Sequence, residues 1–257
     1  MKRLIDTLVS LVSIGVILQS LPAFTDAGRT FFFYLQKKTA PSLEINKDTL
    51  PPLGTILQGS QSICIIGDSI SAGSENGGFP WYLPLTAAFP HLSIDNVAQG
   101  GATSKSTLQK LHQIQKCDAY LFALGTNDVR YRDSAKGAMT VEEYTENISL
   151  IIRKCLSLNP EAKLIFIAPW CSIPEDPIPP LSREKKEQML AQYAEALKKI
   201  SILFGGIYIN PTPQLSPIVY HKTLYHSFLM DHIHPIYPEG CYLYSAAVWE
   251  ASFTPQN

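Results

Sequence analysis

Short apolar segments alternate with longer segments of helical periodicity from residue 61 onward. Five apolar segments have the length and the bounding residues of buried strands, at 62–67, 92–98, 119–125, 163–169 and 206–210. The remaining periodic segments predict helices at 79–88, 104–115, 141–158, 183–203 and 239–252. Buried strands that alternate with helices are typical of a parallel sheet covered on both faces. The pattern therefore predicts an α/β fold with a central five-stranded parallel sheet.

Two of these helices carry clear start signals. Thr140 is followed three residues later by Glu143, which is the capping-box pattern. Ser182 stands immediately before the long segment 183–203 and is a favoured N-cap residue. We therefore expect both helices to begin at these positions.

The first 60 residues differ from the rest of the chain. Residues 7–25 are uncharged, and as a helix they would span about 28 Å, close to a bilayer core of about 30 Å. Residues 1–27 fit a cleaved signal peptide, a retained membrane anchor or a buried or interfacial apolar helix. Residues 28–60 are first aromatic and then polar with several prolines, which predicts an interfacial or linker lead-in to a domain at 61–257. We expect membrane association through residues 7–25 and a domain that lies outside the cytoplasm.

Composition and charge narrow the classes of function. Apolar residues make up 46% of the 257 residues, which is enough apolar surface for a folded core and argues against a disordered chain. The 21 basic and 22 acidic residues give a net charge of −1, so no basic excess favours a nucleic-acid partner. The five cysteines show no C-x-x-C or Cys/His spacing of a structural zinc site.

Polar clusters follow the predicted strands. They are Gly-Asp-Ser at 67–69, Asn-x-Ala-x-x-Gly at 96–101, Gly-Thr-Asn-Asp at 125–128 and Asp-x-x-His-Pro at 231–235. In open parallel sheets, ligands bind beyond the carboxyl ends of the strands. We therefore expect these four clusters to converge on one edge of the sheet.

The residue types in these clusters fit acyl transfer, which needs a nucleophile, a base, a group that orients the base, and donors for an oxyanion. Ser69 lies at a strand-to-helix turn, where its hydroxyl can be exposed. His234 can accept the serine proton, and Asp231 can reach the other imidazole nitrogen across a tight turn. The Ser69 N–H, the Gly101 N–H and the Asn127 side chain are the candidate oxyanion donors.

The four clusters, in this order and spacing, resemble the sequence blocks of the SGNH (GDSL-type) hydrolases over roughly residues 61–250. The resemblance implies a flavodoxin-like three-layer α/β/α sandwich with esterase or acylhydrolase activity. It implies Ser69 as the nucleophile that forms an acyl-enzyme, with Asp231 and His234 completing the triad. It also implies an oxyanion hole of Ser69, Gly101 and Asn127.

The sequence departs from the family pattern at two positions. Ile70 stands where leucine is usual, and Ala98 stands where many members have glycine. Neither change removes a catalytic group. We expect Asp68 and Asp128, which adjoin the catalytic positions, to support the site rather than to react.

Other site chemistries have less support. Ser69 has no G-x-S-x-G context, and the chain contains no Walker A or G-x-G-x-x-G motif. Four histidines lie between positions 221 and 234 beside Asp231, but their spacing matches no zinc motif. We therefore expect no metal and no cofactor, and we expect His232 to line the site or face solvent.

Two stretches bear on the substrate. Residues 73–83 are rich in glycine and aromatic residues, which fit either a pocket wall or packing of the first helix on the sheet. Residues 169–180 are rich in proline and follow the fourth strand, where a stiff wall or lid hinge is expected. By resemblance to family members with export or membrane segments, we expect an ester substrate with a short acyl group such as acetyl, on a carbohydrate or a lipid. An O-acyltransferase with the same triad and a non-catalytic polysaccharide-binding protein remain the alternatives.

Overall fold

A computed structural model describes residues 42–76, 78–132, 135–170, 172–173 and 175–254. The predicted signal or anchor segment, residues 1–27, lies outside the described residues, as does its predicted apolar helix. Among the residues that the structure describes, no helix combines the length and the apolar character needed to cross a bilayer.

Five parallel strands form the centre of the molecule. They are β1 (Ser62–Gly67), β2 (Ser93–Asn96), β3 (Ala119–Ala123), β6 (Lys163–Ile167) and β7 (Ile207–Ile209). Their order in the sheet is β2-β1-β3-β6-β7, and every neighbouring pair is parallel. This confirms the predicted five-stranded parallel sheet. β2 lies on one side of β1 and β3 lies on the other, so the direction of the strand order reverses at β1. In open parallel sheets, ligands bind at the carboxyl ends of the strands where such a reversal occurs.

Each central strand is buried on both faces, and this explains its continuous apolar sequence. In β1, Ile63 and Ile65 belong to one hydrophobic cluster, whereas Cys64 and Ile66 belong to a second cluster. Successive side chains of a strand point to opposite faces of the sheet. The two clusters are therefore the two cores of a three-layer sandwich.

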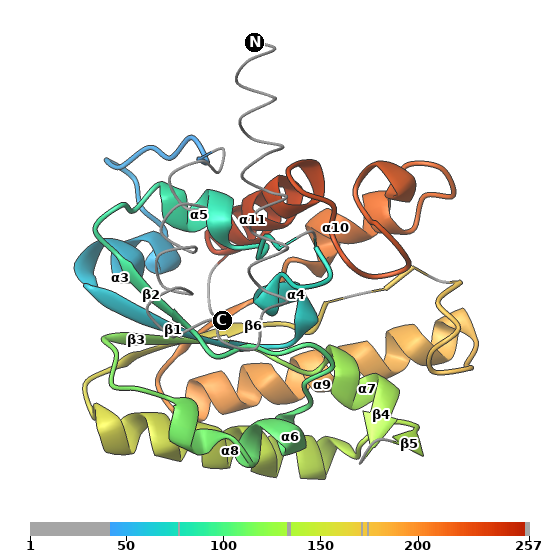
Figure 1. The fold of residues 1–257 in the computed structure, drawn as a ribbon, viewed down its shortest axis with the longest axis horizontal. Coiled ribbons are helices and arrows are strands. Elements are labelled where there is room, and N and C mark those ends of the chain that lie inside the picture. Colours follow the sequence, from blue (N-terminus) through green and yellow to red (C-terminus); the bar gives the residue numbers. More distant parts are fainter. Residues whose placement is uncertain (1–41, 77, 133–134, 171, 174, 255–257) are drawn as a thin grey trace, which may run out of the picture.

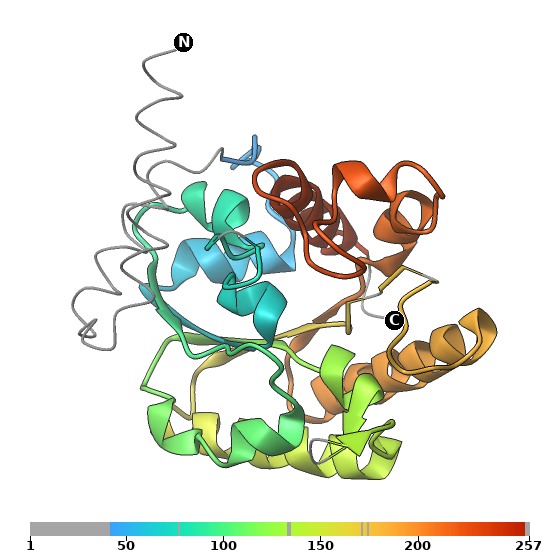
Figure 2. The same ribbon diagram turned by 45° about the vertical axis from the view of Figure 1, so that its right-hand side comes forward.

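Helices cover both faces of the sheet (Figures 1 and 2). One layer contains α3 (Pro52–Gly59), α5 (Leu83–Ala87), α10 (Thr212–Val219) and α11 (Glu239–Ala251). The opposite layer contains α6 (Ser104–Leu108), α8 (Val141–Leu158) and α9 (Arg183–Leu203). Two short helices, α4 (Ser69–Ala72) and α7 (Thr126–Arg130), follow β1 and β3 directly, and a small hairpin of β4 (Tyr131–Arg132) and β5 (Ala135–Lys136) follows α7.

The two predicted helix starts are confirmed. Thr140 Oγ1 accepts a hydrogen bond from the Glu143 N–H at 3.1 Å, and the Glu143 carboxylate accepts one from the Thr140 N–H at 2.9 Å. Ser182 Oγ accepts from the Lys185 N–H at 3.3 Å. These bonds satisfy backbone donors that a helix start leaves without partners.

The structure differs from the sequence expectation in three helical regions. Residues 52–59 form α3 instead of an extended lead-in, because Leu53 and Leu57 are buried in the core beside the sheet. The helix expected at 79–88 is shortened to α5. The helix expected at 104–115 ends at Leu108 and is followed by a separate 3₁₀ turn. Helical periodicity alone therefore did not give the bounds of these three helices.

Candidate active site

The turn after β1 presents Ser69 at the carboxyl edge of the sheet. Ser69 is the first residue of α4, and Asp68 caps this helix by accepting a hydrogen bond from the Ile70 N–H at 3.1 Å. A Cβ atom on Gly67 would lie 2.6 Å from the Ser71 side chain. Only glycine therefore lets α4 approach the end of β1 so closely.

Ser69, His234 and Asp231 form a continuous relay. His234 Nε2 lies 2.9 Å from Ser69 Oγ, and His234 Nδ1 lies 2.8 Å from Asp231 Oδ2. A carboxylate only accepts hydrogen bonds, so Nδ1 carries the proton and Nε2 is left to accept from the serine hydroxyl. The structure thus brings the three predicted triad residues together in the geometry of a nucleophile, a base and an orienting acid.

The Asp231 carboxylate is also fixed by the turn that carries it. Its Oδ1 accepts hydrogen bonds from the Ile233 and His234 N–H groups, both at 2.8 Å. Partial burial by itself raises the pKa of Asp231, but the bonds from the His234 ring and from these two N–H groups hold that pKa well below its ordinary value. The carboxylate therefore stays ionised at neutral pH.

The predicted oxyanion donors lie on two loops at the same edge. Asn127 is buried at the start of α7, and one N–H of its amide donates to the Ala102 carbonyl at 3.1 Å. An amide NH₂ has two donors, so this bond orients the group and leaves the second N–H for a ligand. Gly101, next to Ala102, is exposed and has a φ of +68°, a conformation that favours glycine.

The loop that carries Gly101 is tied to the nucleophile turn. Asn96 Nδ2 donates to the Ser71 carbonyl at 3.0 Å, and the Gln99 N–H donates to the Gly67 carbonyl at 3.2 Å. Residues 96–101 therefore connect the end of β2 to the end of β1 and to α4.

Asp68 and Asp128, which the sequence analysis expected to support the site, are both buried. The Asp128 carboxylate accepts from the Ser104 N–H at 2.9 and 3.0 Å and from the Ser104 hydroxyl, which joins α7 to the start of α6. Burial raises the pKa of Asp68 to about 7 and that of Asp128 to about 6. The bonds from Ile70 to Asp68 and from Ser104 to Asp128 oppose this rise.

The proline-rich loop after β6 holds the turn that carries Asp231 and His234. The Ile173 N–H donates to the His232 carbonyl at 2.9 Å, and Trp170 Nε1 donates to the Ile233 carbonyl at 2.6 Å. Thr126 Oγ1, at the start of α7, donates to the Trp170 carbonyl at 3.2 Å. The described part of segment 169–180 is therefore a scaffold of the site.

Sequence reasoning missed a charged cluster beside the triad. Arg130 and Asp176 are buried, and their charged groups contact the ring of His232, which the sequence analysis expected to line the site or face solvent. The only sequence signal for Arg130 is its position three residues after Asn127. Asp176 lies inside the proline-rich loop, and nothing in the sequence around it indicates a buried ion pair.

The aromatic residues after the nucleophile belong to the core. Trp81 and Tyr82 are fully buried, and Phe79 stacks on Tyr237 with ring centroids 3.7 Å apart. Of the two interpretations of segment 73–83, the structure favours packing for these side chains. Among the described residues, no group of three or more His, Cys, Asp or Glu side chains could hold a metal ion.

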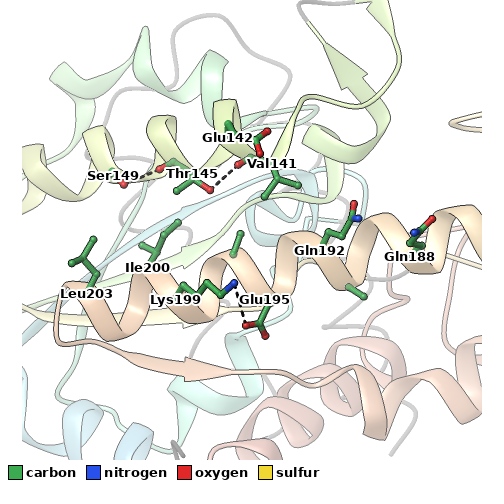
Figure 3. A pocket seen from close by; sticks show the side chains of 12 residues that line it. Val141, Glu142, Thr145, Ser149, Gln188, Gln192, Glu195, Lys199, Ile200 and Leu203 are labelled. Carbon is green, nitrogen blue, oxygen red and sulfur yellow. Dashed lines mark hydrogen bonds and ion pairs between the residues drawn. The ribbon is translucent and has the colours of Figure 1, made fainter.

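A separate groove of about 680 Å³ lies between α8 and α9 (Figure 3). Its hydroxyl groups are engaged within α8, since Thr145 donates to the Val141 carbonyl and Ser149 to the Thr145 carbonyl, both at 2.7 Å. Lys199 pairs with Glu195 at 3.7 Å. None of Ser69, Asp231 and His234 lines the groove.

Comparisons with known proteins identify the family and the fold. The model of the GDSL-like lipase/acylhydrolase family matches residues 65–236. No curated protein sequence matches the chain significantly. Among solved structures, a protein described as a GDSL-like lipase from Parabacteroides merdae is similar with a TM-score of 0.60 and 18% identity, over 82% of this chain and 99% of that one. The acetylxylan esterase Axe2 from Geobacillus stearothermophilus is similar with a TM-score of 0.55 and 20% identity, over 76% and 95%. At these identities the structural likeness shows the fold.

Proposed function

Because the chain belongs to the GDSL-like lipase/acylhydrolase family of carboxylic ester hydrolases, we propose that it is a serine esterase that works through an acyl-enzyme on Ser69. The observation that carries this proposal is the relay from Asp231 through His234 to Ser69, with contacts of 2.8 and 2.9 Å. The relay stands at the edge of the sheet where the strand order reverses, which is the usual ligand site of such folds.

In the first half of the reaction, Ser69 Oγ attacks the ester carbonyl carbon while His234 Nε2 takes the hydroxyl proton. The carbonyl oxygen becomes negatively charged and accepts hydrogen bonds from the Ser69 N–H, the Gly101 N–H and the second N–H of Asn127. His234 then gives its proton to the leaving oxygen, the carbon–oxygen bond of the ester breaks, and an alcohol departs.

In the second half, a water molecule attacks the acyl-enzyme and His234 takes one of its protons. The tetrahedral intermediate collapses, His234 returns the proton to Ser69 Oγ, and a carboxylic acid leaves. The ionised Asp231 stabilises the imidazolium in both halves and keeps the ring in the tautomer that faces Ser69.

For the substrate, we propose a short acyl group such as acetyl, carried by a carbohydrate. The fold similarity to Axe2, which is an acetylxylan esterase, supports this class. An acylated lipid is the alternative alcohol portion. We also propose that residues 1–27 direct or anchor the domain outside the cytoplasm, which cell fractionation of the full chain would test.

The test is ester hydrolysis by the purified full-length chain and two serine variants. Acetate release would be followed from p-nitrophenyl acetate and from acetylated xylan. Ser69→Ala should lower kcat by about 10⁴–10⁶-fold. Ser149→Ala is the matched control, because the hydroxyl of Ser149 donates to the Thr145 carbonyl within α8, and this variant should keep full activity. Turnover that survives in Ser69→Ala would contradict the acyl-enzyme.

Product analysis separates the two alternatives to hydrolysis. If an added sugar or alcohol becomes acylated faster than acetate is released, the enzyme is an O-acyltransferase with the same triad. If a fluorophosphonate probe does not label Ser69 and no ester is cleaved, the cleft serves binding alone. A preference for acylated lipid over acetylated xylan would replace the carbohydrate with a lipid substrate.

A further inference from the structure

Arg130, Asp176 and His232 form a charged cluster next to the triad. Arg130 Nη2 lies 3.1 Å from His232 Nε2 and 3.5 Å from Asp176 Oδ1. His232 Nε2 lies 3.3 Å from the same Asp176 oxygen. The three residues come from three segments, namely the end of α7, the proline-rich loop, and the turn between Asp231 and His234.

The Arg130–Asp176 ion pair of the cluster is buried, and a contribution to stability is therefore not enough to explain its presence. The side chains of Asp176 and Arg130 are 0% and 10% exposed. Removing such charges from water costs about as much free energy as their attraction returns, so a buried pair is a weak source of stability. Buried pairs of this kind are better understood as specifying one arrangement of the segments that they join.

Asp176 is itself rigidly held. Its Oδ1 accepts a hydrogen bond from the Ile178 N–H at 3.0 Å, and its backbone carbonyl accepts one from the buried Lys186 ammonium of α9. The carboxylate is therefore a fixed point on the scaffold, to which the turn that carries His232 is attached.

His232 is the residue through which the cluster reaches the triad. Its ring contacts Arg130 and Asp176, and its backbone carbonyl accepts from the Ile173 N–H at 2.9 Å. It lies between Asp231 and His234 in a turn that is closed by bonds from backbone N–H groups to the Asp231 carboxylate. A shift of the His232 side chain therefore shifts the turn that carries both the acid and the base.

Arg130 also ties this turn to the oxyanion side of the site. α7 is five residues long, with Asn127 near its start and Arg130 at its end. One short helix therefore contacts both the oxyanion position and, through His232, the base.

We propose that Arg130 and Asp176 are positioning residues that act through His232 to hold the Asp231–His234 turn in register with Ser69. The proposal rests on the proposed serine esterase function. Misplacement of a catalytic group by about 1 Å can cost about 10²-fold in rate, so loss of the cluster should lower kcat and leave KM little changed.

The test uses the full chain, with Arg130→Met, His232→Leu, their double variant and His232→Gln. The main measurement is the second-order rate of labelling of Ser69 by a fluorophosphonate, because it reports nucleophile activation without a natural ester. The kcat and KM for p-nitrophenyl acetate are measured beside it. Arg183→Met is the matched control, since Arg183 is exposed and contacts Glu187 of the same helix and the Tyr220 ring.

Each single change should lower the labelling rate and kcat by about 10- to 100-fold, with KM within about threefold of wild type. The double variant should be no slower than the slower single variant, because Arg130 acts through His232. His232→Gln should recover most of the rate, since its amide keeps a donor and an acceptor near the position of Nε2. Arg183→Met should match wild type.

Three results would overturn the proposal. The first is a double variant whose loss of labelling rate equals the product of the two single losses. The second is a rise in KM without a fall in kcat. The third is a labelling rate that falls only in proportion to the unfolded fraction of each variant and does not recover in His232→Gln. If Arg130→Met does not fold, the comparison of His232→Leu with His232→Gln still tests the proposal, because the His232 side chain is 31% exposed and tolerates substitution. Absence of labelling in the wild-type chain would instead refute the proposed function, and the positioning role would fall with it.

Discussion

Ser69 and His234 are 165 positions apart in the chain, yet Ser69 Oγ and His234 Nε2 lie 2.9 Å apart. The contact depends on how the C-terminal segment packs. α11 packs against α5, and the Ser245 hydroxyl of α11 donates to the Trp81 carbonyl at 2.5 Å. The helix after His234 is thereby docked on the segment after Ser69, so the contact between Ser69 and His234 depends on the packing of the helical layer that contains α5 and α11.

Asp231→Asn should lower kcat by about 10⁴-fold without unfolding the chain. An asparagine can turn its NH₂ toward His234 Nδ1, which favours the tautomer that carries the proton on Nε2 and so cannot accept one from Ser69. Hydrolysis of p-nitrophenyl acetate measures this. Asp118→Asn is the matched control, because Asp118 also accepts backbone N–H bonds, from Gln61 and Ser62, outside the site. Activity within tenfold of wild type in Asp231→Asn would contradict the role of Asp231.

Asn127→Ala should lower kcat by about 10²–10³-fold and change KM little, because its second N–H acts on the developing oxyanion rather than on the bound ester. Steady-state kinetics with one aryl ester separates the two constants. Asn159→Ala removes a similar bond, from Asn159 Nδ2 to the Cys117 carbonyl at 2.8 Å, away from the site. If both variants lose activity equally, the effect of Asn127 is structural rather than catalytic.

Gly101→Ala should lower both stability and kcat. A Cβ atom there meets no atom within 4 Å, so the cost comes from the φ of +68° and is about 1 kcal/mol of unfolding free energy. Relief of that strain moves the Gly101 N–H away from the oxyanion. Gly205→Ala is a close control, with a φ of +69° and equally open space outside the site. It should lose similar stability in urea unfolding and keep its kcat; equal kcat in the two variants would refute the donor role of Gly101.

Asp68→Asn should flatten the dependence of stability on pH between about 4 and 7. Burial raises the pKa of Asp68 to about 7, so in this window the folded chain binds more protons than the unfolded chain. The unfolding free energy of the wild type therefore falls as pH rises through the window, and asparagine removes this contribution while keeping an acceptor for the Ile70 N–H. Urea unfolding at several pH values measures the difference between the two proteins.

Two other carboxyl groups, those of Asp128 and Asp231, also make the unfolding free energy depend on pH. Asp128, whose pKa burial raises to about 6, contributes with the same sign in both proteins and cancels in the comparison. The lowered pKa of Asp231 acts with the opposite sign, and its effect lies at more acidic pH than this window. A slope that is the same in Asp68→Asn and wild type would mean that Asp68 is ionised across the whole window.

Much of the fold follows from local patterns. Buried strands need apolar side chains on both faces, and long helices need caps and a continuous apolar face, so 62–67, 141–158 and 183–203 are evident from the sequence. Short elements lack such patterns. α3, α4 and α7 are too short to be stable alone and exist because the sheet packs against them or because they follow strand ends.

The candidate site divides in the same way. The blocks of the sequence suggest acyl chemistry by their residue types and order, and the proposed roles of five residues follow from these blocks alone: Ser69, Asp231, His234, Gly101 and Asn127. The contacts of His232 with Arg130 and Asp176 were decided only by the tertiary structure, because a buried ion pair joins residues that no local spacing relates. A nucleophile and its base are identifiable from their chemistry, whereas the groups that hold them in place are identifiable only from where the folded chain puts them.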